Sequence, residues 1–495
     1  MVYKFCMPKK SIDVSIKDRC LQIASLAFLN PFTPERQARY RELFGENHDM
    51  DADEPFPELR KTLEELIEKL GGEEAMDYRT YGAQDGEWIR ILTLFAGYHR
   101  FYQELDAHLQ REQDQTSPCA FSHGDGCMDY LQRGGFSEEE ATWYVGVFYQ
   151  LRRAHRAIRE FLVGETPCMM SFKARLWSHL FTHDIRHYET CMWERMEDFS
   201  LLLVGETGTG KGNAAQAMGL SCYIPYEPKT RKFAMIPRAM FVATNLSQYS
   251  LSLVESELFG HRKGAFTGAL KDHEGLFSRC PEYGMVFLDE IVEVPLTLQI
   301  KLLRLLQDRE FSPVGSDQLL RFKGRVVAAA SPEVDQALLK GQFREDFYYR
   351  LCSDRLALPP LRERLCESSG ELPRLVSGLF RKMTGTQDKA LLASVLRQIE
   401  AHAEHGWPGN VRELEQAIRQ VLIKGFYEPL ILPKESHSSV DQGMLFDGMG
   451  EASAEQCLAA YAQHLHRKHQ SYEAVARILS VDRRTARKYV QLPAD

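Results

Sequence analysis

The sequence lacks several features that would place it in a specialised class of protein. Its 495 residues contain no run of about 20 apolar residues, the length that a membrane-crossing helix needs. The first residues, MVYKFCMPKK, lack the apolar stretch of a signal peptide. Glycine and proline are scattered, and no internal repeat indicates a fibrous or solenoid protein. We therefore expect a soluble, cytoplasmic protein without a membrane partner.

Paired cysteines and an excess of basic residues are also missing. The eleven cysteines are dispersed and form no CxxC pair, which is typical of a reduced protein with free thiols. The net charge of −8 excludes a protein that coats nucleic acid with its whole surface, but it allows one basic module. The length predicts roughly three domains.

The chain divides into four regions by pattern. Residues 1–165 have helical periodicity, for example over 57–70, and a capping box begins at Ser137. Strands and helices do not alternate there, which argues against an α/β receiver domain. Residues 434–452 are rich in Ser, Gly and Asp and are predicted to be a linker, and residues 453–495 return to helix.

The central region, residues 166–433, has a different pattern. Short apolar runs at 200–204, 239–244, 285–288 and 325–330 alternate with helix-like segments, and a helical stretch follows over 363–427. Buried strands that alternate with helices predict a parallel sheet covered on both faces. The fold class is therefore multidomain α/β, with a mostly helical first domain.

A glycine-rich loop follows the first apolar run and fits the pattern G-x-x-x-x-G-K. Its residues are Gly205, Glu206, Thr207, Gly208, Thr209, Gly210, Lys211 and Gly212. Backbone N–H groups of such a loop cradle phosphates, and Lys211 would reach the terminal phosphates. Gly212 stands where a Ser or Thr ligand of Mg²⁺ usually lies. The alternative is a chance glycine turn.

A second half of a nucleotide site follows in the expected order. The apolar segment MVFL ends in Asp289 and Glu290. Such a strand would hold Asp289 near Mg²⁺ and Glu290 near an attacking water. The alternative is a buried strand followed by a solvated acidic turn, but two motifs in the correct order favour the nucleotide site.

One hexapeptide is highly specific. Residues 255–269 read ESELFGHRKGAFTGA, and the motif itself comprises Gly264, Ala265, Phe266, Thr267, Gly268 and Ala269. With QIKLLRLLQDREFSPVGS, FREDFYYRL, LPPLRER and WPGNVRELEQAI, it makes residues 170–430 resemble the AAA+ domain of bacterial enhancer-binding proteins, the activators of sigma-54 RNA polymerase. The resemblance implies ATP and Mg²⁺ as cofactors and a homo-oligomeric, hexameric ring whose loop engages sigma-54.

The resemblance assigns roles to further residues. Asn245 corresponds to the asparagine that couples Glu290 to the nucleotide state. Arg344 and Arg350 correspond to arginine fingers that reach the ATP of a neighbouring subunit, although a lone arginine is more often a surface ion pair. Arg412 corresponds to the second sensor, which contacts phosphates of its own subunit.

The sequence departs from the family in three places. Gly212 replaces the usual glutamate after the loop lysine. The first-sensor strand ends in Ala330 and Ser331, where the family has Thr and Asn. The connection over 222–240 is longer than usual. The first two departures concern the rate of hydrolysis and its coupling more than the binding of nucleotide.

The last region resembles a Fis-type helix-turn-helix, with a break near 479–481. Basic residues outnumber acidic residues between 451 and 495, although the whole chain is acidic. The candidates for DNA contact are Arg483, Arg484, Thr485, Arg487 and Lys488. The alternative is a solvated basic helix that closes a small bundle.

Residues 1–165 carry no family signature, and by position we expect a regulatory domain. Cys119, His123 and Cys127 have metal-like spacing, but a polar loop with free thiols is the favoured interpretation. A run of aromatic residues is expected to form core or, alternatively, to line a ligand pocket. Its members are Trp143, Tyr144, Phe148 and Tyr149.

The leading hypothesis is an ATP-dependent activator. It would bind enhancer DNA and use ATP hydrolysis to remodel closed complexes of sigma-54 RNA polymerase into open complexes. A nucleotide-sensing DNA-binding regulator without remodelling is the alternative, and Gly212 and Ser331 favour it. A third possibility is an AAA+ remodeller of another target. The intact GAFTGA sequence argues against both alternatives.

Overall fold

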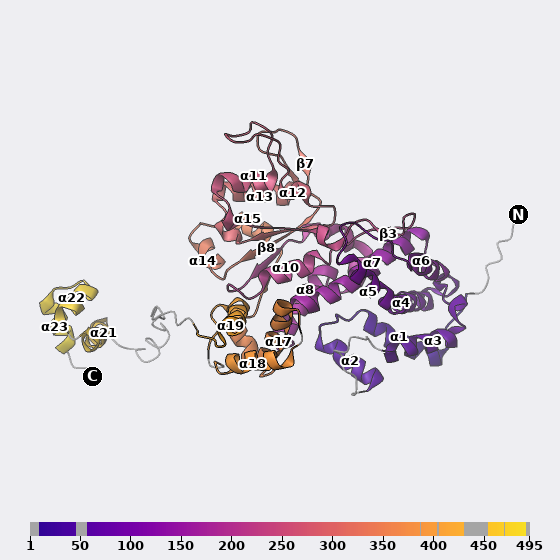
Figure 1. Ribbon diagram of the computed structural model, residues 1–495, viewed down its shortest axis with the longest axis horizontal. Helices are drawn as coiled ribbons and strands as arrows, with labels where there is room; N and C mark the ends of the chain where they lie inside the picture. Colours follow the sequence, from indigo (N-terminus) through magenta and orange to yellow (C-terminus); the bar gives the residue numbers. More distant parts are fainter. Residues whose placement is uncertain are drawn as a thin grey trace. The chain divides into compact units, whose positions relative to one another are not determined.

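A computed structural model describes residues 9–45, 57–386, 388–402, 405–429, 454–469 and 471–491 (Figure 1). Contacts divide the chain into two compact units, Met1–Glu428 and Pro429–Asp495. The predicted linker, residues 434–452, lies outside the described residues. Among the helices that the structure describes, none combines the length and the apolar character needed to cross a membrane.

All regular elements described before residue 201 are helical, as the sequence predicts. The helices are α1 (Val14–Ala27), α2 (Pro34–Phe44), α3 (Pro57–Leu70), α4 (Ala83–Arg100), α5 (Tyr102–Glu112), α6 (Gly124–Arg133), α7 (Glu138–Phe161), α8 (Pro167–Phe181) and the short α9 (Ile185–His187). The predicted bounds of α3 are confirmed. The capping box of α7 is also confirmed, because the Glu140 amide donates to Ser137 Oγ at 3.2 Å and the Ser137 amide donates to Glu140 Oε2 at 2.8 Å.

A five-stranded parallel sheet forms the centre of the first unit. Its strands are β1 (Leu201–Val204), β4 (Phe241–Asn245), β5 (Met285–Asp289), β8 (Arg325–Ala330) and β9 (Asp354–Ala357), in the order β4-β5-β8-β1-β9. The four predicted apolar runs are all strands. The edge strand β9 escaped prediction because it begins with the charged pair Asp354 and Arg355 and is only partly buried.

The two faces of the sheet belong to two hydrophobic cores, and β1 alternates between them. Leu201 and Leu203 face a core that the sheet shares with α7, α8 and α10 (Lys211–Gly219). Leu202 and Val204 face the other core, which contains α11 (Leu251–Phe259), α12 (Leu276–Arg279), α13 (Leu296–Asp308), α14 (Val334–Leu339) and α15 (Glu345–Leu351). The N-terminal helices therefore pack directly on one face of the sheet.

A helical subdomain follows the sheet, as the sequence predicts. It comprises α16 (Leu361–Glu367), α17 (Glu371–Thr384), α18 (Lys389–Glu400) and α19 (Asn410–Lys424), packed around their own core. Two short hairpins, which were not predicted, interrupt the sheet connections. They are β2 (Tyr226–Glu227) with β3 (Lys232–Phe233), and β6 (Glu310–Phe311) with β7 (Leu320–Arg321).

The second unit contains three described helices, α21 (Ala454–His469), α22 (Tyr472–Leu479) and α23 (Arg483–Gln491). Leu465, Val475 and Ala486 contribute to its small core. The predicted break near 479–481 is confirmed, since α22 ends at Leu479 and Ser480 takes a left-handed conformation with φ +52°.

Candidate nucleotide site and exposed loop

The glycine-rich loop joins β1 to the N-terminus of α10, and its backbone needs two glycines. Gly208 and Gly210 have φ values of +80° and +106°, which other residues rarely adopt. A Cβ atom on Gly208 would lie 2.2 Å from the carbonyl oxygen of Gly409. The two glycines therefore allow the loop to curl without strain, and the loop packs tightly against the helical subdomain.

Lys211 begins α10 and bends back over the loop. Its Nζ donates to the carbonyl oxygens of Gly205 at 2.6 Å and Glu206 at 3.1 Å. Burial lowers the pKa of Lys211, while the nearby charges of Asp289 and Glu290 raise it. The ammonium thus occupies the centre of a cradle in which it faces two carboxylates, as the sequence predicts for a phosphate site.

Asp289 and Glu290 stand at the carboxyl end of β5. Asp289 is half-buried, and burial raises its pKa, although Lys211 opposes this shift. Its Oδ1 accepts the Glu290 amide at 3.0 Å. Glu290 is exposed and has φ +56°, an unfavourable conformation for a residue with a side chain. Carboxylate oxygens of this kind are the ligands that Mg²⁺ prefers, so the residues fit that ion.

Asn245 ends β4 and Ser331 follows β8, the two strands that flank β5 on either side. Asn245 pairs in register with Asp289, and its side-chain oxygen accepts from the Ser247 amide at 2.9 Å. Ser331 hydrogen-bonds Glu333, which lowers the pKa of that carboxyl, as the charge of Lys211 also does. Sequence reasoning missed Glu333, because no motif distinguishes it from other surface acids.

The helical subdomain holds the loop through residues that sequence reasoning had not assigned. Arg362 makes a bidentate ion pair with Glu206, with N–O distances of 2.6 and 2.8 Å. Asn410 is fully buried and donates to Glu206 Oε2 and to the carbonyl of Thr207, both at 3.1 Å. Its Oδ1 accepts the Leu361 amide at 2.7 Å. The segments LPPLRER and WPGNVRE contained the signal, but only as unassigned polar positions.

The remaining loop residues and Arg412 lie near the contacts that Arg362 and Asn410 make with the loop. The hydroxyl of Thr209 donates to the Glu206 carbonyl at 2.8 Å. Gly212 is exposed, with open space where a side chain would stand. Arg412 is exposed, and its charge lowers the pKa values of Lys211 and Asp289. It therefore lies within electrostatic reach of the site.

Arg344 and Arg350 lie at the two ends of α15. The Arg344 guanidinium pairs with Asp346 at 2.7 Å on the surface. Arg350 donates to the carbonyl oxygen of Leu306 at 2.8 and 3.0 Å, which ties α15 to the end of α13. Within the described part of the chain, the Arg344 guanidinium contacts Asp346, and the Arg344 amide donates to Gln299 Oε1 at 2.9 Å.

The hexapeptide over 264–269 lies at the tip of a long connection between α11 and α12, next to the β6–β7 hairpin (Figure 1). Gly264 and Gly268 have φ values of +83° and +104°, and the Gly264 amide donates to the Ala269 carbonyl at 2.9 Å. Ala265 packs against the opposite loop at Gly315. Phe266 remains 36% exposed and Thr267 is exposed, so the tip presents a ring and a hydroxyl to solvent.

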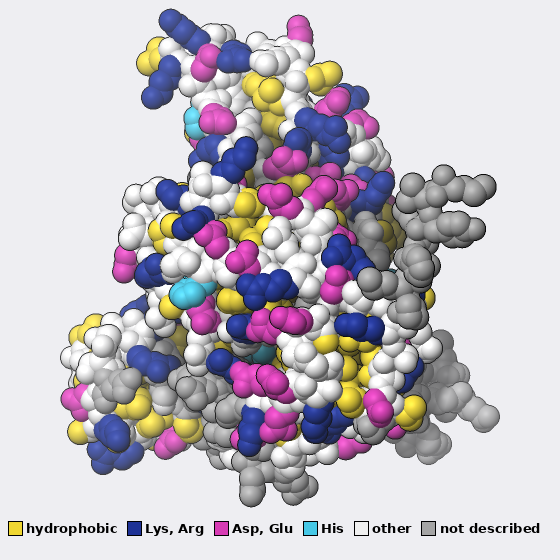
Figure 2. Space-filling view, turned by 90° about the vertical axis from the view of Figure 1, so that its right-hand side faces the viewer, with side chains coloured by type: hydrophobic (Ala, Val, Ile, Leu, Met, Phe, Trp, Pro, Cys, Tyr) yellow, Lys and Arg dark blue, Asp and Glu magenta, His cyan; other side chains and the backbone are white. Residues whose placement is uncertain are grey.

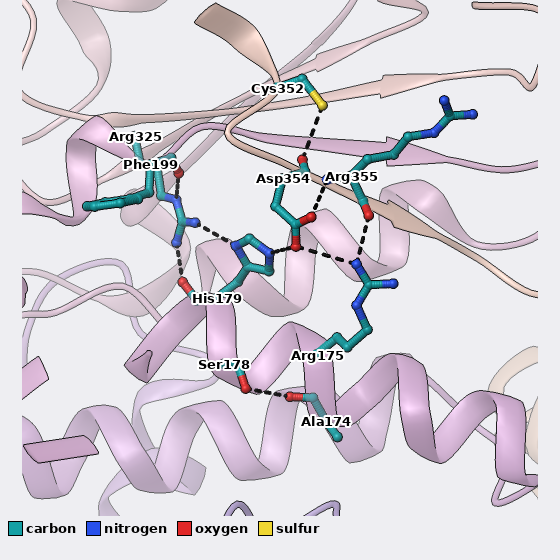
Figure 3. Close-up of polar contacts among 9 residues, drawn as sticks. All are labelled: Ala174, Arg175, Ser178, His179, Phe199, Arg325, Cys352, Asp354 and Arg355. Atoms are coloured by element: carbon teal, nitrogen blue, oxygen red, sulfur yellow. Dashed lines mark hydrogen bonds and ion pairs between the residues drawn. The ribbon is translucent and has the colours of Figure 1, made fainter. Parts of the chain in front are cut away.

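The opposite, amino-terminal edge of the sheet is closed by a polar network with α8 (Figure 3). His179 Nε2 lies 2.7 Å from Asp354 Oδ2 at the start of β9. Arg325, at the start of β8, donates to the carbonyl oxygens of His179 and Phe199, both at 2.6 Å. Arg175 adds a bond of 2.9 Å to the Arg355 carbonyl. Helix α8 is thereby fixed to two strands.

Helix α7 makes a second connection, to the far end of α10. Arg153 donates to the carbonyl oxygens of Leu220 at 2.6 Å and Cys222 at 2.7 Å. Gln150 donates to the Ser221 carbonyl at 3.0 Å. These three carbonyls follow the C-terminus of α10, where a cation is favourable. The N-terminal helices thus contact the helix that begins with Lys211.

The candidate metal residues of the N-terminal region are not brought together. Cys119 Sγ lies 3.9 Å from His108 Nδ1, while His123 contacts Ser122 and Cys127 is buried elsewhere. The set of Cys119, His123 and Cys127 was therefore the wrong grouping, because spacing along a loop does not fix where side chains point. The described cysteines, Cys119 and Cys127 among them, form no disulfide.

The aromatic run on α7 divides between the hydrophobic core and the wall of a cavity. Trp143, Tyr144 and Phe148 line a cavity of about 1730 Å³, whose walls also come from α1, α2, α4 and α8. Tyr149 faces the opposite side of α7 and stacks on Phe233 with ring centroids 3.7 Å apart. His99 lines the same cavity with its Nε2 atom unpaired.

In the second unit, α23 presents its basic residues to solvent. Arg483, Arg484, Arg487 and Lys488 are exposed, and Arg483 pairs with Glu473 at 3.2 Å. Thr485 hydrogen-bonds Asp482, which caps the helix by accepting the amides of Arg484 at 2.8 Å and Thr485 at 3.0 Å. In contrast, the face of the molecule drawn in Figure 2 mixes basic and acidic side chains without one dominant sign.

Comparisons with known proteins place the site in a family context. The model of the sigma-54 interaction domain matches residues 183–357. The regulatory protein AtoC of Escherichia coli is 36% identical over 301 residues, 60% of this chain and 60% of AtoC. The Nif-specific regulatory protein of Azotobacter vinelandii is 40% identical over 226 residues, 45% of this chain and 40% of that protein.

The solved structure of NtrX from Brucella abortus in complex with ATP covers 75% of this chain and 81% of its own, at 19% identity and a TM-score of 0.40. The chain spans 40 to 60% of the length of the two relatives above. The matched family model covers the sheet, the exposed loop and the carboxylate pair, but not the N-terminal helices or the second unit.

Proposed function

We propose that this chain, whose residues 183–357 match the model of the sigma-54 interaction domain, is an ATP-dependent activator of sigma-54 RNA polymerase. ATP hydrolysis would move the loop over 264–269 and remodel closed promoter complexes into open complexes. The observation that carries this proposal is the exposed Phe266–Thr267 tip on the same domain as a glycine-rich loop over which Lys211 folds.

The site residues suggest how the chain would bind ATP with Mg²⁺. The loop amides and Lys211 would hold the β- and γ-phosphates, and Lys211 would exchange its two carbonyl contacts for phosphate oxygens. Asp289 would hold the ion, and Glu290 would orient the attacking water. Arg362 and Asn410 tie the loop to the helical subdomain, so nucleotide and subdomain would move together.

A ring of subunits, most simply a hexamer, would complete the site. Arg344 is proposed to leave Asp346 and reach the ATP of the next subunit, where a cation stabilises charge in the transition state. Arg350 is anchored on Leu306 and would position α15 for this contact. Asn245 would couple Glu290 to the nucleotide, because its strand pairs with the strand that carries the acids.

The other regions would supply recognition and control. Helix α23 of the second unit would enter the major groove of enhancer DNA, with Arg484, Arg487 and their neighbours reading bases or binding phosphates. The division into a regulatory region (1–165), an ATPase region (166–433), a linker (434–452) and a DNA-binding region (453–495) belongs to the same proposal.

A substitution at the loop tip tests the proposal. Thr267→Ala in the full chain should retain ATP hydrolysis within about twofold, because the residue is exposed and lies far from the glycine-rich loop in the sequence. The same variant should lose sigma-54-dependent promoter opening. Thr297→Ala, an exposed threonine on α13, is the matched control and should keep both activities. Promoter opening by Thr267→Ala at the normal level would contradict the proposal.

Mixing two inactive variants tests the ring. Lys211→Ala removes the cradle and Arg344→Ala removes the finger, so each alone should fail to hydrolyse ATP. If the finger acts between subunits, an equimolar mixture should regain part of the rate, since Lys211→Ala subunits donate Arg344 to intact cradles. A mixture as inactive as its components would contradict a finger acting in trans.

The alternative, a nucleotide-sensing DNA-binding regulator, has one specific observation in its favour. Ser331 bonds Glu333 where the family has an asparagine at the strand end, and Gly212 offers no side chain. Tight ATP binding without turnover in the wild-type chain would favour this alternative over remodelling.

A further inference from the structure

Three metal-ligand side chains converge between α5 and the loop that follows it. His108 and Glu112 lie one turn apart on the same face of α5, and Cys119 returns over them. One donor atom from each of the three lies within 4.8 Å of the others. His108 meets its two neighbours with different ring nitrogens: Nε2 is 3.5 Å from Glu112 Oε1, and Nδ1 is 3.9 Å from Cys119 Sγ, so a single ion would use only one of the two nitrogens.

The cluster is unusual because its polar atoms are buried. His108 is fully buried and Glu112 is 4% exposed, yet the His108 Nε2 and Glu112 Oε1 atoms have no hydrogen-bond partner. Buried polar atoms without a partner are costly, and a buried carboxylate needs a compensating positive charge. The two atoms face one another at 3.5 Å, a spacing too long for a well-formed hydrogen bond.

We propose that His108, Glu112 and Cys119 form a binding site for a divalent transition-metal ion of the Zn²⁺ class. Imidazole nitrogen, carboxylate oxygen and thiolate sulfur are the ligands that such an ion takes in proteins, and sulfur disfavours Mg²⁺ and Ca²⁺. Tetrahedral Zn²⁺ holds its ligand atoms roughly 3.5 Å apart, so a contraction of about 1 Å closes this set around an ion.

The surroundings suit a metal site with one open position. The rings of Phe121, Tyr149 and Phe233 enclose His108, with centroids 5.3 to 5.7 Å away. Cys119 is only partly buried, so water or an added ligand can reach the fourth position from its side. On binding, the ion displaces the proton of the Cys119 thiol to solvent and bonds the thiolate.

The site is covered by the long connection over 222–240. Phe233, on β3, belongs to the hairpin of this connection, and the Phe121 amide donates to the Arg231 carbonyl at 2.8 Å. Arg231 also pairs with Asp125 at 2.6 Å. The segment that departs from the family in length is therefore the segment that closes the cluster.

A short chain of contacts leads from the cluster to the helix that begins with Lys211. The Tyr149 hydroxyl donates to Glu112, and the Arg153 guanidinium lies 4.4 Å from the centre of the Tyr149 ring. Arg153 in turn binds the carbonyls that follow α10. An ion that holds Glu112 would fix the position of Tyr149, and through it the contact of α7 with α10.

The test titrates Co²⁺ into the full chain after removal of metals under reducing conditions. We expect one equivalent to bind with a thiolate-to-Co²⁺ charge-transfer band, and Zn²⁺ to displace it. Cys119→Ser should abolish the band, and His108→Gln should weaken binding by about a hundredfold or more. Cys191→Ser, an exposed cysteine outside the cluster, is the control and should bind like the wild type.

Glu112→Gln provides a second variant of nearly identical shape if Cys119→Ser does not fold. Zn²⁺ should raise the melting temperature of the wild-type chain but not that of Glu112→Gln. A wild-type chain without the charge-transfer band, or a band that persists in Cys119→Ser and disappears in Cys127→Ser, would overturn the proposal. Neither readout depends on ATP hydrolysis, so failure here is distinct from failure of the proposed function.

Discussion

The two edges of the parallel sheet carry similar charged side chains, but they differ in how many of these charges are already paired within the protein. At the carboxyl edge, Lys211 faces Asp289 and Glu290 without a direct bond to either, and it rests on backbone carbonyls. At the amino edge, Arg325 and His179 are fully engaged with carbonyls and Asp354 (Figure 3).

This difference separates an edge that could bind a ligand from an edge that holds α8 against the strands. The carboxyl edge keeps opposite charges close and unpaired, and an arriving phosphate and cation could bind between them. The amino edge satisfies its polar groups internally, which fixes α8 to the strands and leaves little for a ligand. We therefore expect variants of the first edge to change activity and variants of the second to change stability.

The largest expected effect is on turnover at the carboxyl edge. Lys211→Ala should lower ATP hydrolysis by about 10²–10³-fold, since it removes the cation that faces the phosphates. The free energy of unfolding should change little, because the lysine bonds only loop carbonyls. Steady-state hydrolysis and urea unfolding measure the two quantities. An equally large loss of stability would erase the proposed contrast between the edges.

Arg325→Met tests the amino edge. The substitution leaves the part-buried carbonyls of His179 and Phe199 without their donor and removes the buried guanidinium, so the free energy of unfolding should fall by about 3 kcal/mol. Arg321→Met, at an exposed position on β7, is the matched control and should change it by less than about 0.5 kcal/mol. Similar losses in both variants, measured by urea unfolding, would show that the network is not a clamp.

The same network predicts a pH dependence. Burial and the charge of Arg325 lower the pKa of His179 to about 4, although Asp354 opposes the shift. Between pH 6.5 and 4 the unfolded chain therefore binds a proton that the folded chain does not, and stability decreases as the pH falls. This histidine should contribute on the order of 3 kcal/mol over that interval.

The measurement compares urea unfolding from pH 7.5 to 4 in the wild type and in His179→Gln. Because burial also lowers the pKa values of His99 and His155, the variant should show a shallower pH dependence, not a flat one. Identical slopes would mean that His179 contributes nothing to it.

Asn410→Ala should have an intermediate effect, on both stability and nucleotide binding. It leaves the buried Leu361 amide without an acceptor and releases Glu206 and Thr207, at a cost of about 2 kcal/mol in unfolding. Nucleotide binding, followed by calorimetry, should weaken as well. Gln416→Ala, exposed on the same helix, should leave both unchanged. Normal nucleotide affinity in Asn410→Ala would mean that the contacts of Asn410 with the glycine-rich loop serve stability alone.

The smallest effect is expected at Gly212. Its position is open and helical, so Gly212→Glu should raise the free energy of unfolding by about 0.5–1 kcal/mol. Gly210→Ala, two residues earlier, should lower it by about 1 kcal/mol because its φ of +106° disfavours a side chain. If Gly212→Glu also destabilises the chain, then the open space is not available to a side chain.

Local patterns predicted much of the fold. The central strand runs, the bounds of α3 and the capping box of α7 follow from apolar periodicity and from side chains that bond their own backbone nearby. The edge strand β9 was not predicted. It pairs with β1, a segment about 150 residues earlier in the sequence, and it begins with charged residues instead of an apolar run.

The candidate site shows the same division. The proximity of Lys211 and Asp289 was predicted because two short motifs specify the backbone conformation at the carboxyl ends of β1 and β5, while their roles toward ATP and Mg²⁺ stay predictions. The contacts of Arg362, Asn410 and Glu333 were not predicted, since each partner lies far along the chain or carries no distinctive pattern.

By itself, the sequence determined the glycine-rich loop after β1, the acidic pair after β5, the exposed hexapeptide and the helical character of the first region. Only the tertiary structure decided that α7 and α8 share a core with the sheet, that Arg325 meets His179, and that Cys119 belongs with His108 and not with Cys127. The physical reason is that motifs encode local backbone geometry, whereas packing chooses which distant segments supply the partners of buried polar groups.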